Sequence, residues 1–467
     1  MKIPFNGSKK GLNIIVVGCG KVGRTIVERL CGEGHDITVI DSSPDRINEI
    51  TGSYDVMGVT GNGASHATLV DAGIDKADIL IAVTQSDELN ILCCIMAKQA
   101  SECDTIARVR TPDYSREAGY IKDKLGLTLI INPDLATAGE IARLLYLPTA
   151  LDVNAFAHGQ VEMVRFKLPE GNILAGKSIA SFEYESIDNI LICAVERGDE
   201  LSIPSGDFVM REGDLVSFVS PMGEARKFLE DIGITTKKIR STIIVGGSKA
   251  AFYLARRLIG MNVDVKIIEE NEKRCEELSK LLPKATIINA DGTNRDVLKE
   301  EGIEFTDSFM ALTGMDEQNI FLTLHARNVS NAKVITKIDH LMFKDVLDPL
   351  DLGSIIYPRY LTAEAIVAYV RRKKNTLNSS TIETLYHLFN EKAEAIEFMI
   401  ERESGVTGRK LSELKLKDSL LICCIVRSGK MIIPSGNDEI KVGDDVMVLT
   451  THTGFDDIDD ILVQNRS

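Results

Sequence analysis

The sequence predicts an α/β protein made of a duplicated unit, in which a doubly wound parallel sheet domain precedes a small α+β domain of mainly antiparallel strands. Three observations lead to this prediction. Short apolar strands alternate with amphipathic helices up to about residue 145, short strands separated by Pro, Gly and Asp turns follow, and both patterns then return in the same order. Alternating strands and helices imply a parallel sheet covered on both faces, and right-handed crossovers make it doubly wound.

The length of the chain limits the number of its domains, and its net charge limits the kinds of partner it can bind. A chain of 467 residues holds roughly two to four domains at the usual size of about 150 residues each. The net charge of -15 argues against a nucleic-acid partner, because a phosphate backbone needs a basic surface. No apolar run approaches the roughly 18 residues of a membrane span, and the first ten residues lack the apolar core of a signal peptide.

The cysteines and histidines indicate a reducing compartment without a structural metal. The nine cysteines form no Cys-x-x-Cys, and the seven histidines are scattered. A reduced cysteine inside an apolar run behaves as a small hydrophobe. We expect this of Cys19, Cys93, Cys94, Cys193, Cys423 and Cys424.

The first domain begins with an apolar run that ends in Gly18-Cys19-Gly20-Lys21-Val22-Gly23, and Asp41 closes the next apolar run. Strand, glycine turn, helix, strand and acid in this order are typical of a Rossmann-like nucleotide site. The first glycine permits the turn, the second lets a pyrophosphate approach, and the third allows close helix–strand packing. The alternative is a glycine turn that serves packing alone.

The ligand that this loop predicts is a nucleotide. The amides from Cys19 to Val22 lie at a helix N-terminus, which favours phosphate, and Lys21 can reach a terminal phosphate or a pyrophosphate. Asp41 can bind ribose hydroxyls. An acid there disfavours a 2′-phosphate, so NAD or ATP is expected rather than NADP.

Two more residues end strands at the same predicted edge. Thr84 closes the fourth strand, and Arg108 lies near the end of the fifth, where a guanidinium can pair with phosphate. The alternatives are a strand-end cap for Thr84 and an ion pair with a helix acid for Arg108. Asp87 and Glu88 resemble an acid–base pair, but they begin a helix, and we favour a role at its N-terminus.

The remaining elements follow from periodicity. In the first domain, strands are expected at 13–17, 37–40, 55–60, 79–84, 105–109 and 127–131, and helices near 22–32, 44–51, 64–73, 87–100 and 135–145. The next block has apolar runs at 161–168, 190–195 and 215–219 between turns such as Ile203-Pro204-Ser205-Gly206. This spacing predicts a small antiparallel domain with a helix or two.

The second half repeats the first at a nearly constant offset. Val245-Gly246-Gly247-Ser248-Lys249 matches the opening loop, Glu269 matches Asp41, and Ile433-Pro434-Ser435-Gly436 matches the turn at Ile203. A duplicated two-domain unit explains these collinear matches. The predicted domains are 11–146, 150–233, 239–372 and 380–464.

The second glycine loop is degenerate. Ser248 and Ala251 replace the glycines expected from Gly20 and Gly23, and a Cβ then stands where a pyrophosphate should approach. Glu269 can still hold a ribose, so weak or adenosine-only binding and a purely structural role both remain open. The polar and basic stretch from Arg371 to Lys374 and on through Ser380 is expected to end a helix in solvent, and contact with phosphates or with an acidic partner is the alternative.

The chain resembles the RCK family, the regulators of potassium conductance. Two pairs of RCK domains without a membrane segment are similar to the cytosolic regulatory subunits of Trk-type potassium uptake systems. The motifs that carry the resemblance are the loop from Gly18 to Gly23, Asp41, Thr84-x-x-Asp87-Glu88-x-Asn90, the stretch Arg108-Val109-Arg110-Thr111-Pro112-Asp113-Tyr114, and, for the companion C-terminal domain, Ile203-Pro204-Ser205-Gly206 with Gly213-Asp214.

The resemblance implies a gating protein without catalytic or metal-binding residues. Such proteins form rings, here a homotetramer, on the cytoplasmic face of a potassium-translocating (TrkH-like) membrane subunit, and ATP, ADP or NAD(H) changes the shape of the ring. The implied nucleotide contacts are Gly18, Cys19, Gly20, Lys21, Val22, Gly23, Asp41, Thr84, Gln85 and Arg108.

The alternative is an NAD-dependent oxidoreductase with unrecognised catalytic residues. A dehydrogenase needs a proton-transfer residue near the nicotinamide, and the small β blocks carry no repeated histidine. Duplication of both domains favours the regulator, because a pseudo-symmetric ring needs repeated interfaces.

Overall fold

The computed structural model describes residues 11–182, 189–235, 237–339, 350–374, 380–389 and 391–463. The N-terminal residues 1–10, for which no signal peptide is expected, lie outside these ranges. The chain forms two compact units, Met1–Thr137 with Tyr357–Val367 and Ala138–Ile356 with Ala368–Ser467. Within the described ranges, no helix combines the length and the apolar character that crossing a membrane requires.

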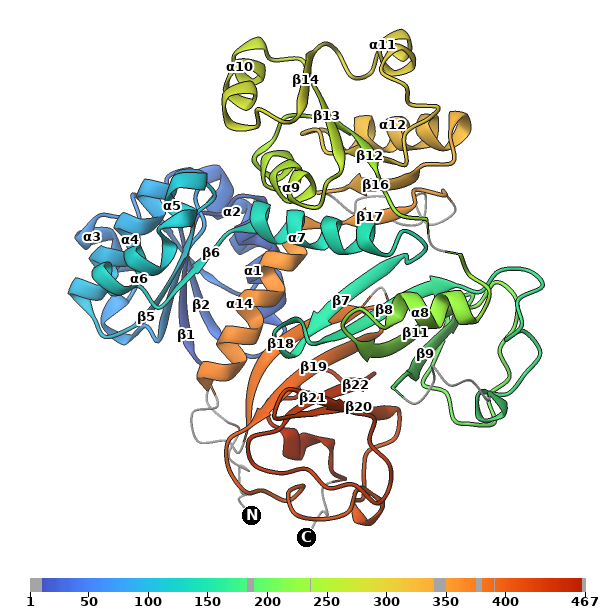
Figure 1. The fold of residues 1–467 in the computed structure, drawn as a ribbon. Coiled ribbons are helices and arrows are strands. Elements are labelled where there is room, and N and C mark those ends of the chain that lie inside the picture. The colour runs from blue at the N-terminus through green and yellow to red at the C-terminus, as the bar shows by residue number, and fades with distance from the viewer. Residues whose placement is uncertain are drawn as a thin grey trace. The chain divides into compact units, whose positions relative to one another are not determined.

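The first unit is built on one parallel sheet, in which Figure 1 labels β1, β2, β5 and β6. The strand order is β3-β2-β1-β4-β5-β6. The order reverses between β1 and β4, which is the switch point of a doubly wound sheet. The strands are β1 (Asn13–Val17), β2 (Asp36–Asp41), β3 (Met57–Thr60), β4 (Ile79–Ala82), β5 (Asp104–Arg108) and β6 (Leu129–Ile131). The predicted fold class is confirmed here.

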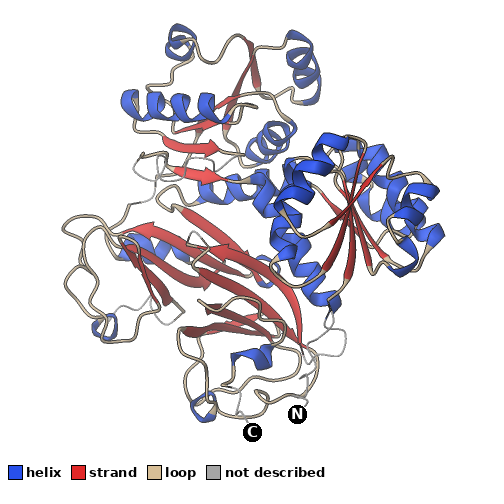
Figure 2. Cartoon of the chain, turned by 180° about the vertical axis from the view of Figure 1, so that it is seen from behind, coloured by secondary structure: helices blue, strands red, loops and turns tan. Residues whose placement is uncertain are grey.

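Helices cover both faces of this sheet (Figure 2). Ile15 and Val17 of β1 pack with Cys93 and Ala97 of α4 in one core beneath α3 and α4. The helices are α1 (Lys21–Cys31), α2 (Pro44–Ser53), α3 (His66–Asp71), α4 (Asp87–Ala100), α5 (Pro112–Arg116), α6 (Ala118–Leu125), and the first parts of α7 (Pro133–Tyr146) and α14 (Pro358–Lys374). The sequence did not predict α5 and α6, because neither helix buries a side chain and so neither has an apolar stripe.

The second unit contains a second parallel sheet with the same topology, in the order β14-β13-β12-β15-β16-β17. The sheet comprises β12 (Ser241–Val245), β13 (Asp264–Glu269), β14 (Thr286–Asn289), β15 (Ser308–Ala311), β16 (Lys333–Lys337) and β17 (Ser354–Ile356), with helices α9 (Lys249–Gly260), α10 (Glu272–Leu281), α11 (Arg295–Glu300) and α12 (Asp316–Val329). The duplication predicted from the sequence is therefore present in the fold.

The second unit also contains both antiparallel sheets, in the orders β10-β9-β11-β8-β7 and β18-β19-β22-β20-β21. The two orders are equivalent when the strands are matched along the chain. The elements are β7 (Asp152–Phe156), β8 (Val161–Lys167), β9 (Leu191–Arg197), β10 (Glu200–Ser202), β11 (Leu215–Pro221) and α8 (Ala225–Asp231), then β18 (Ser380–Leu388), β19 (Ala393–Ile400), β20 (Leu420–Arg427), β21 (Lys430–Ile432) and β22 (Asp445–Thr450).

These two antiparallel sheets share one hydrophobic core. Phe156 and Cys193 from the first sheet pack in the same cluster as Phe389 and Cys423 from the second block. The rings of Phe156 and Tyr386 meet edge-to-face with their centroids 5.2 Å apart. The small β blocks therefore stabilise each other by burying their apolar faces together.

The cysteines are free thiols, and the six predicted to lie in apolar runs are all buried. Burial raises the pKa of the Cys93 thiol to about 12. A thiol that stays protonated is a poor nucleophile and metal ligand. These cysteines are packing residues, as the sequence indicates.

The basic run at the end of α14 differs from its prediction. The described part of α14 extends to Lys374, and within it Arg371 is only 2% exposed, with its guanidinium paired with Glu394 of β19 at 3.0 Å. Lys374 pairs with Asp456 at 3.3 Å. The expectation of a solvated end is therefore wrong for Arg371, because a carboxylate far along the chain meets it in the core.

Candidate nucleotide-binding site

In the glycine loop after β1, packing requires two of the glycines but not the third. Gly18 has φ 103°, and its N–H donates to the Ile40 carbonyl at 2.8 Å. A Cβ on Gly23 would lie 1.9 Å from the Gly18 carbonyl oxygen, so Gly18 and Gly23 are required by the turn and the packing. A Cβ on Gly20 would meet nothing within 4 Å. Packing therefore does not account for Gly20, whose open side is where a phosphate can approach.

The start of α1 is left without a side-chain cap. Gly20 is the N-cap residue, and no side chain accepts from the first turn. Uncapped N–H groups at a helix N-terminus bind anions well. Lys21, the next residue, is exposed.

Asp41 at the end of β2 holds the glycine loop through hydrogen bonds to backbone amides. Its Oδ2 accepts from the Cys19 N–H at 2.7 Å and its Oδ1 from the Ser43 N–H at 2.9 Å. The residue is 7% exposed. Each carboxylate oxygen has further acceptor capacity, which a ribose hydroxyl can use.

Arg46 in the first turn of α2 lies beside the predicted site, and the sequence reasoning missed it. Its guanidinium lies 3.7 Å from the Asp41 carboxylate and remains half exposed. A usable signal was present, because Arg274 occupies the same place in the second half. There it donates to the Gly247 carbonyl at 2.6 Å.

Thr84, just beyond β4, is tied to the rest of the edge through Asn90. Its N–H and its hydroxyl both donate to the Asn90 Oδ1, at 2.8 and 2.7 Å. The Asn90 amide in turn donates to the Arg108 carbonyl at 2.8 Å. The strand-end role weighed for Thr84 accounts for these bonds. The sequence motif contained Asn90 but gave it no role.

Arg108 at the end of β5 is buried, and its guanidinium donates to the Thr84 carbonyl at 2.5 Å. Its Nε is buried without a hydrogen-bond partner in the described chain. Burial, together with the neighbouring Arg110, lowers the pKa of Arg108 to about 10. A buried guanidinium with unused donor capacity suits an anionic ligand.

Asp87 and Glu88 do lie in the first turn of α4, as the sequence predicts. Ser86 caps that helix, and Asp87 instead accepts from the backbone N–H groups of Arg110 and Thr111, at 3.0 and 2.7 Å. The carbonyl of Gln85 accepts from the Arg110 guanidinium at 3.4 Å. Asp87 therefore fixes the turn after β5, which is a structural role.

The predicted site residues therefore lie along one edge of the sheet, at the carboxyl ends of four strands. The bonds described above connect Asp41 to the glycine loop and Thr84 to Arg108. The glycine loop approaches Thr84 as well, since a Cβ on Gly18 would lie 3.0 Å from the Thr84 nitrogen.

The second half keeps the loop but closes it. Gly246 has φ 102°, and Glu269 accepts from the Gly247 N–H at 2.5 Å, as Asp41 does in the first half. Ser248, however, caps α9 by accepting from the Ala251 N–H at 3.2 Å. The donor that a phosphate would use is thus already bonded within the chain.

This fold and this edge define a class of protein with two dinucleotide-type α/β domains, each followed by a small antiparallel domain. The family model described as the TrkA-N domain matches residues 14–133 and 242–358. The model described as the TrkA-C domain matches residues 163–233 and 395–463. The four matches alternate along the chain as the four sheets do.

The chain belongs to the family of the Trk system potassium uptake protein TrkA. It is 32% identical over 446 residues to TrkA homolog 2 of Methanosarcina mazei, with 94% of this chain and 97% of that relative covered. It is 31% identical over 444 residues to TrkA of Halomonas elongata, covering 94% and 95%. Among solved structures, the GsuK channel bound to NAD has the same fold, with a TM-score of 0.62 at 17% identity over 96% of this chain and 78% of that one.

Proposed function

We propose that this chain is the nucleotide-binding regulatory subunit of a Trk-type potassium uptake system. The observation that carries the proposal is the open side of Gly20 before an uncapped helix, next to Asp41. In a family whose members are named as potassium uptake proteins, such a loop is a sensor for a nucleotide signal.

The proposed contacts divide the nucleotide into parts. The loop from Gly18 to Gly23, with Lys21, binds the phosphates, and Asp41 binds the ribose. Arg108, with its unused Nε, approaches a phosphate, and Thr84 and Gln85 form the floor between them. The ligand is ATP, ADP or NAD(H), and NADH is included because GsuK, a protein of the same fold, is described as bound to NAD.

Control of transport follows from linkage. A nucleotide can shift an equilibrium between two arrangements only by binding one of them more tightly. We place the chain at the cytoplasmic face of the membrane, as a homotetrameric ring of domains 11–146, 150–233, 239–372 and 380–464 bound to a TrkH-like potassium-translocating subunit. The nucleotide acts there as a ligand and is not turned over.

The test has two stages. Calorimetry on the purified chain with ATP, ADP and NADH is expected to give one site per chain, with matched variants Asp41→Ala (binding weakened at least tenfold) and Glu269→Ala (binding kept). Potassium flux into vesicles that hold the membrane subunit and this chain is then expected to change with the nucleotide that binds. Substrate-dependent NADH formation, or flux that ignores every nucleotide bound, would overturn the proposal.

A further inference from the structure

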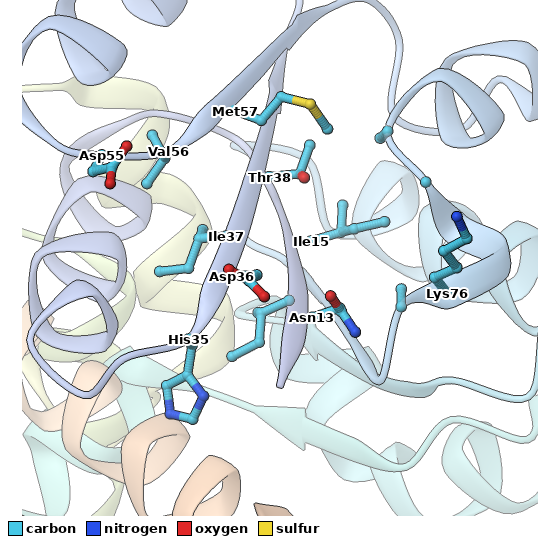
Figure 3. Close-up of a pocket in the computed structure, with 14 residues that line it drawn as sticks. Asn13, Ile15, His35, Asp36, Ile37, Thr38, Asp55, Val56, Met57 and Lys76 are labelled. Carbon is cyan, nitrogen blue, oxygen red and sulfur yellow. The ribbon is translucent and has the colours of Figure 1, made fainter. Parts of the chain in front are cut away.

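A pocket of about 410 Å³ lies in the first unit, at the end of the sheet opposite the glycine loop. It is lined where strands β1, β2 and β3 begin, and by the turn that follows α3. Figure 3 shows Ile15, Thr38 and Met57 on these strands, with Lys76 on the turn. Since Ile15, Thr38 and Met57 are neighbours in register, their side chains share one face of the sheet.

In the second half, a lysine occupies the equivalent position on the sheet. Lys266 stands at the position of Thr38, because it pairs with Ile243 and Thr286 as Thr38 pairs with Ile15 and Met57. Its ammonium donates to the Glu301 carbonyl at 2.9 Å and meets the Glu301 carboxylate at 3.0 Å. Glu301 is the residue that follows the last turn of α11.

The equivalent residues in the first half are too short to fill the groove. Ala72 follows the last turn of α3 as Glu301 follows that of α11. A threonine and an alanine thus replace the lysine and the glutamate that meet across the groove in the second half. The duplicated fold therefore supplies its own comparison, with one groove occupied by a tethered ammonium and the other open.

The lining of the open groove suits the same chemical group. Asp36 lies two residues before Thr38 in β2, so its carboxylate is on the same face of the sheet, and no described residue forms an ion pair with it. Ile15 and Met57 supply apolar surface on which an alkyl chain can lie, as lysine stems do. Lys76 is the cation in the lining, and its exposed side chain is free to turn towards solvent.

We infer that the groove between Thr38 and Ala72 binds a small primary alkylammonium ion, whose ammonium takes the position that Lys266 Nζ occupies in the second half. The Ala72 carbonyl and the Asp36 carboxylate accept its hydrogen bonds, which are strengthened by its charge. The site lies at the opposite end of the sheet from the proposed nucleotide site, so either one can fail without the other.

The test is calorimetry on the full chain with 1,4-diaminobutane at constant ionic strength, and with 1,4-butanediol as the uncharged control. We expect saturable binding of the diamine at one site per chain and no binding of the diol. Thr38→Lys combined with Ala72→Glu copies the second half, and this double variant is expected to weaken the binding of the diamine at least tenfold. Lys76→Gln removes the like charge and is expected to tighten binding.

The converse variant protects the test against misfolding. Lys266→Thr combined with Glu301→Ala should open the second groove and raise the stoichiometry from one diamine per chain to two. Asp36→Asn, an exposed change, should weaken the first site several-fold. No saturable binding to the wild type, equal binding of the diol, or unchanged affinity in the Thr38→Lys, Ala72→Glu variant would overturn the inference.

Discussion

At the scale of single residues, Asp41 joins the two parts of the proposed site. It holds the Cys19 and Ser43 amides while lying where a ribose would bind. We expect Asp41→Ala to weaken nucleotide binding at least tenfold, because each hydrogen bond to a charged group contributes about 1.5–3 kcal/mol. Calorimetry with ATP and NADH measures this.

Glu269→Ala is the matched control for Asp41, since Glu269 holds the Gly247 amide in the closed second loop. Its nucleotide affinity should equal that of the wild type. If Asp41→Ala binds as tightly as Glu269→Ala, Asp41 is not part of the site.

Gly20 distinguishes the two halves most sharply. Gly20→Ser copies Ser248, whose hydroxyl caps its own helix. We expect this change to weaken the binding of ATP far more than the binding of adenosine. The thermal midpoint should stay equal or rise slightly, since serine exceeds glycine as an N-cap by only a few tenths of a kcal/mol (~0.3). Gly20→Ala adds a Cβ without an oxygen. If Gly20→Ala weakens ATP binding as much as Gly20→Ser does, the added Cβ, and not the capping hydroxyl, causes the loss of affinity.

At the scale of elements, the end of α14 is fixed by a buried ion pair. Burial alone would oppose ionisation of Glu394, but hydrogen bonds from His387 and Arg371 outweigh it and hold the pKa of Glu394 at about 2. Arg371→Met leaves this carboxylate buried without its main partner, which typically costs ~3–5 kcal/mol. Hydrogen exchange of the β19 amides measures the loss. Arg372→Met is the control, because Arg372 is exposed and only 3.8 Å from Glu383, and surface pairs contribute ~0–1 kcal/mol.

The same pair gives this element a defined pH dependence. The pKa of Glu394 is lowered from 4.5 to about 2 in the folded chain, so the unfolded chain binds the proton more tightly. The stabilisation is therefore present above about pH 4.5 and is lost as the pH falls towards 2. In Arg371→Met this part of the acid sensitivity of β19 exchange should shrink to the share that His387 maintains. An unchanged acid profile would contradict the assignment.

The elements that the sequence predicted and those it missed differ in a physical way. Strands β1 and β4 are continuous apolar runs buried on both faces, and the pattern reveals them directly. Helices α5 and α6 bury no side chain, so they carry no periodic signal. Likewise the sequence located Gly20 and Asp41, but the partner of Asp87 was out of reach, because Arg110 and Thr111 meet it only after β5 is placed in the sheet.

At the level of the whole molecule, the two halves have diverged after the duplication. The first half keeps an open loop at Gly20, whereas Ser248 closes the second. The second half fills with Lys266 the groove that the first leaves open at Thr38. The repeated sequence revealed the symmetry, but only the bonds made by Ser248 and Lys266 show that the second half has closed both positions that the first half leaves open.

The pairing of the two antiparallel sheets carries the same asymmetry. The turn after β7 contains Ala157 and His158 at φ 49° and 54°, and the turn after β18 contains Phe389 at φ 54°. Glu397, the fifth residue of β19, accepts from the Ala157 N–H at 2.8 Å. Arg165, the fifth residue of β8, lies 5.7 Å from the ring centroid of Phe389. In each turn, therefore, one group meets a suitable partner from the opposite half. The Ala157 amide meets the Glu397 carboxylate, and the Phe389 ring meets the Arg165 guanidinium.

This complementarity predicts that Glu397→Leu loosens the joint core of the two sheets. The Ala157 amide would remain buried without an acceptor, which costs about 1–3 kcal/mol. Its hydrogen exchange should therefore accelerate roughly 5- to 150-fold, the range that this energy gives at room temperature. Glu397→Gln keeps an acceptor oxygen and should retain most of the protection. If both variants exchange alike, the carboxylate does not hold the turn, and pairing of unlike halves depends on the apolar core alone.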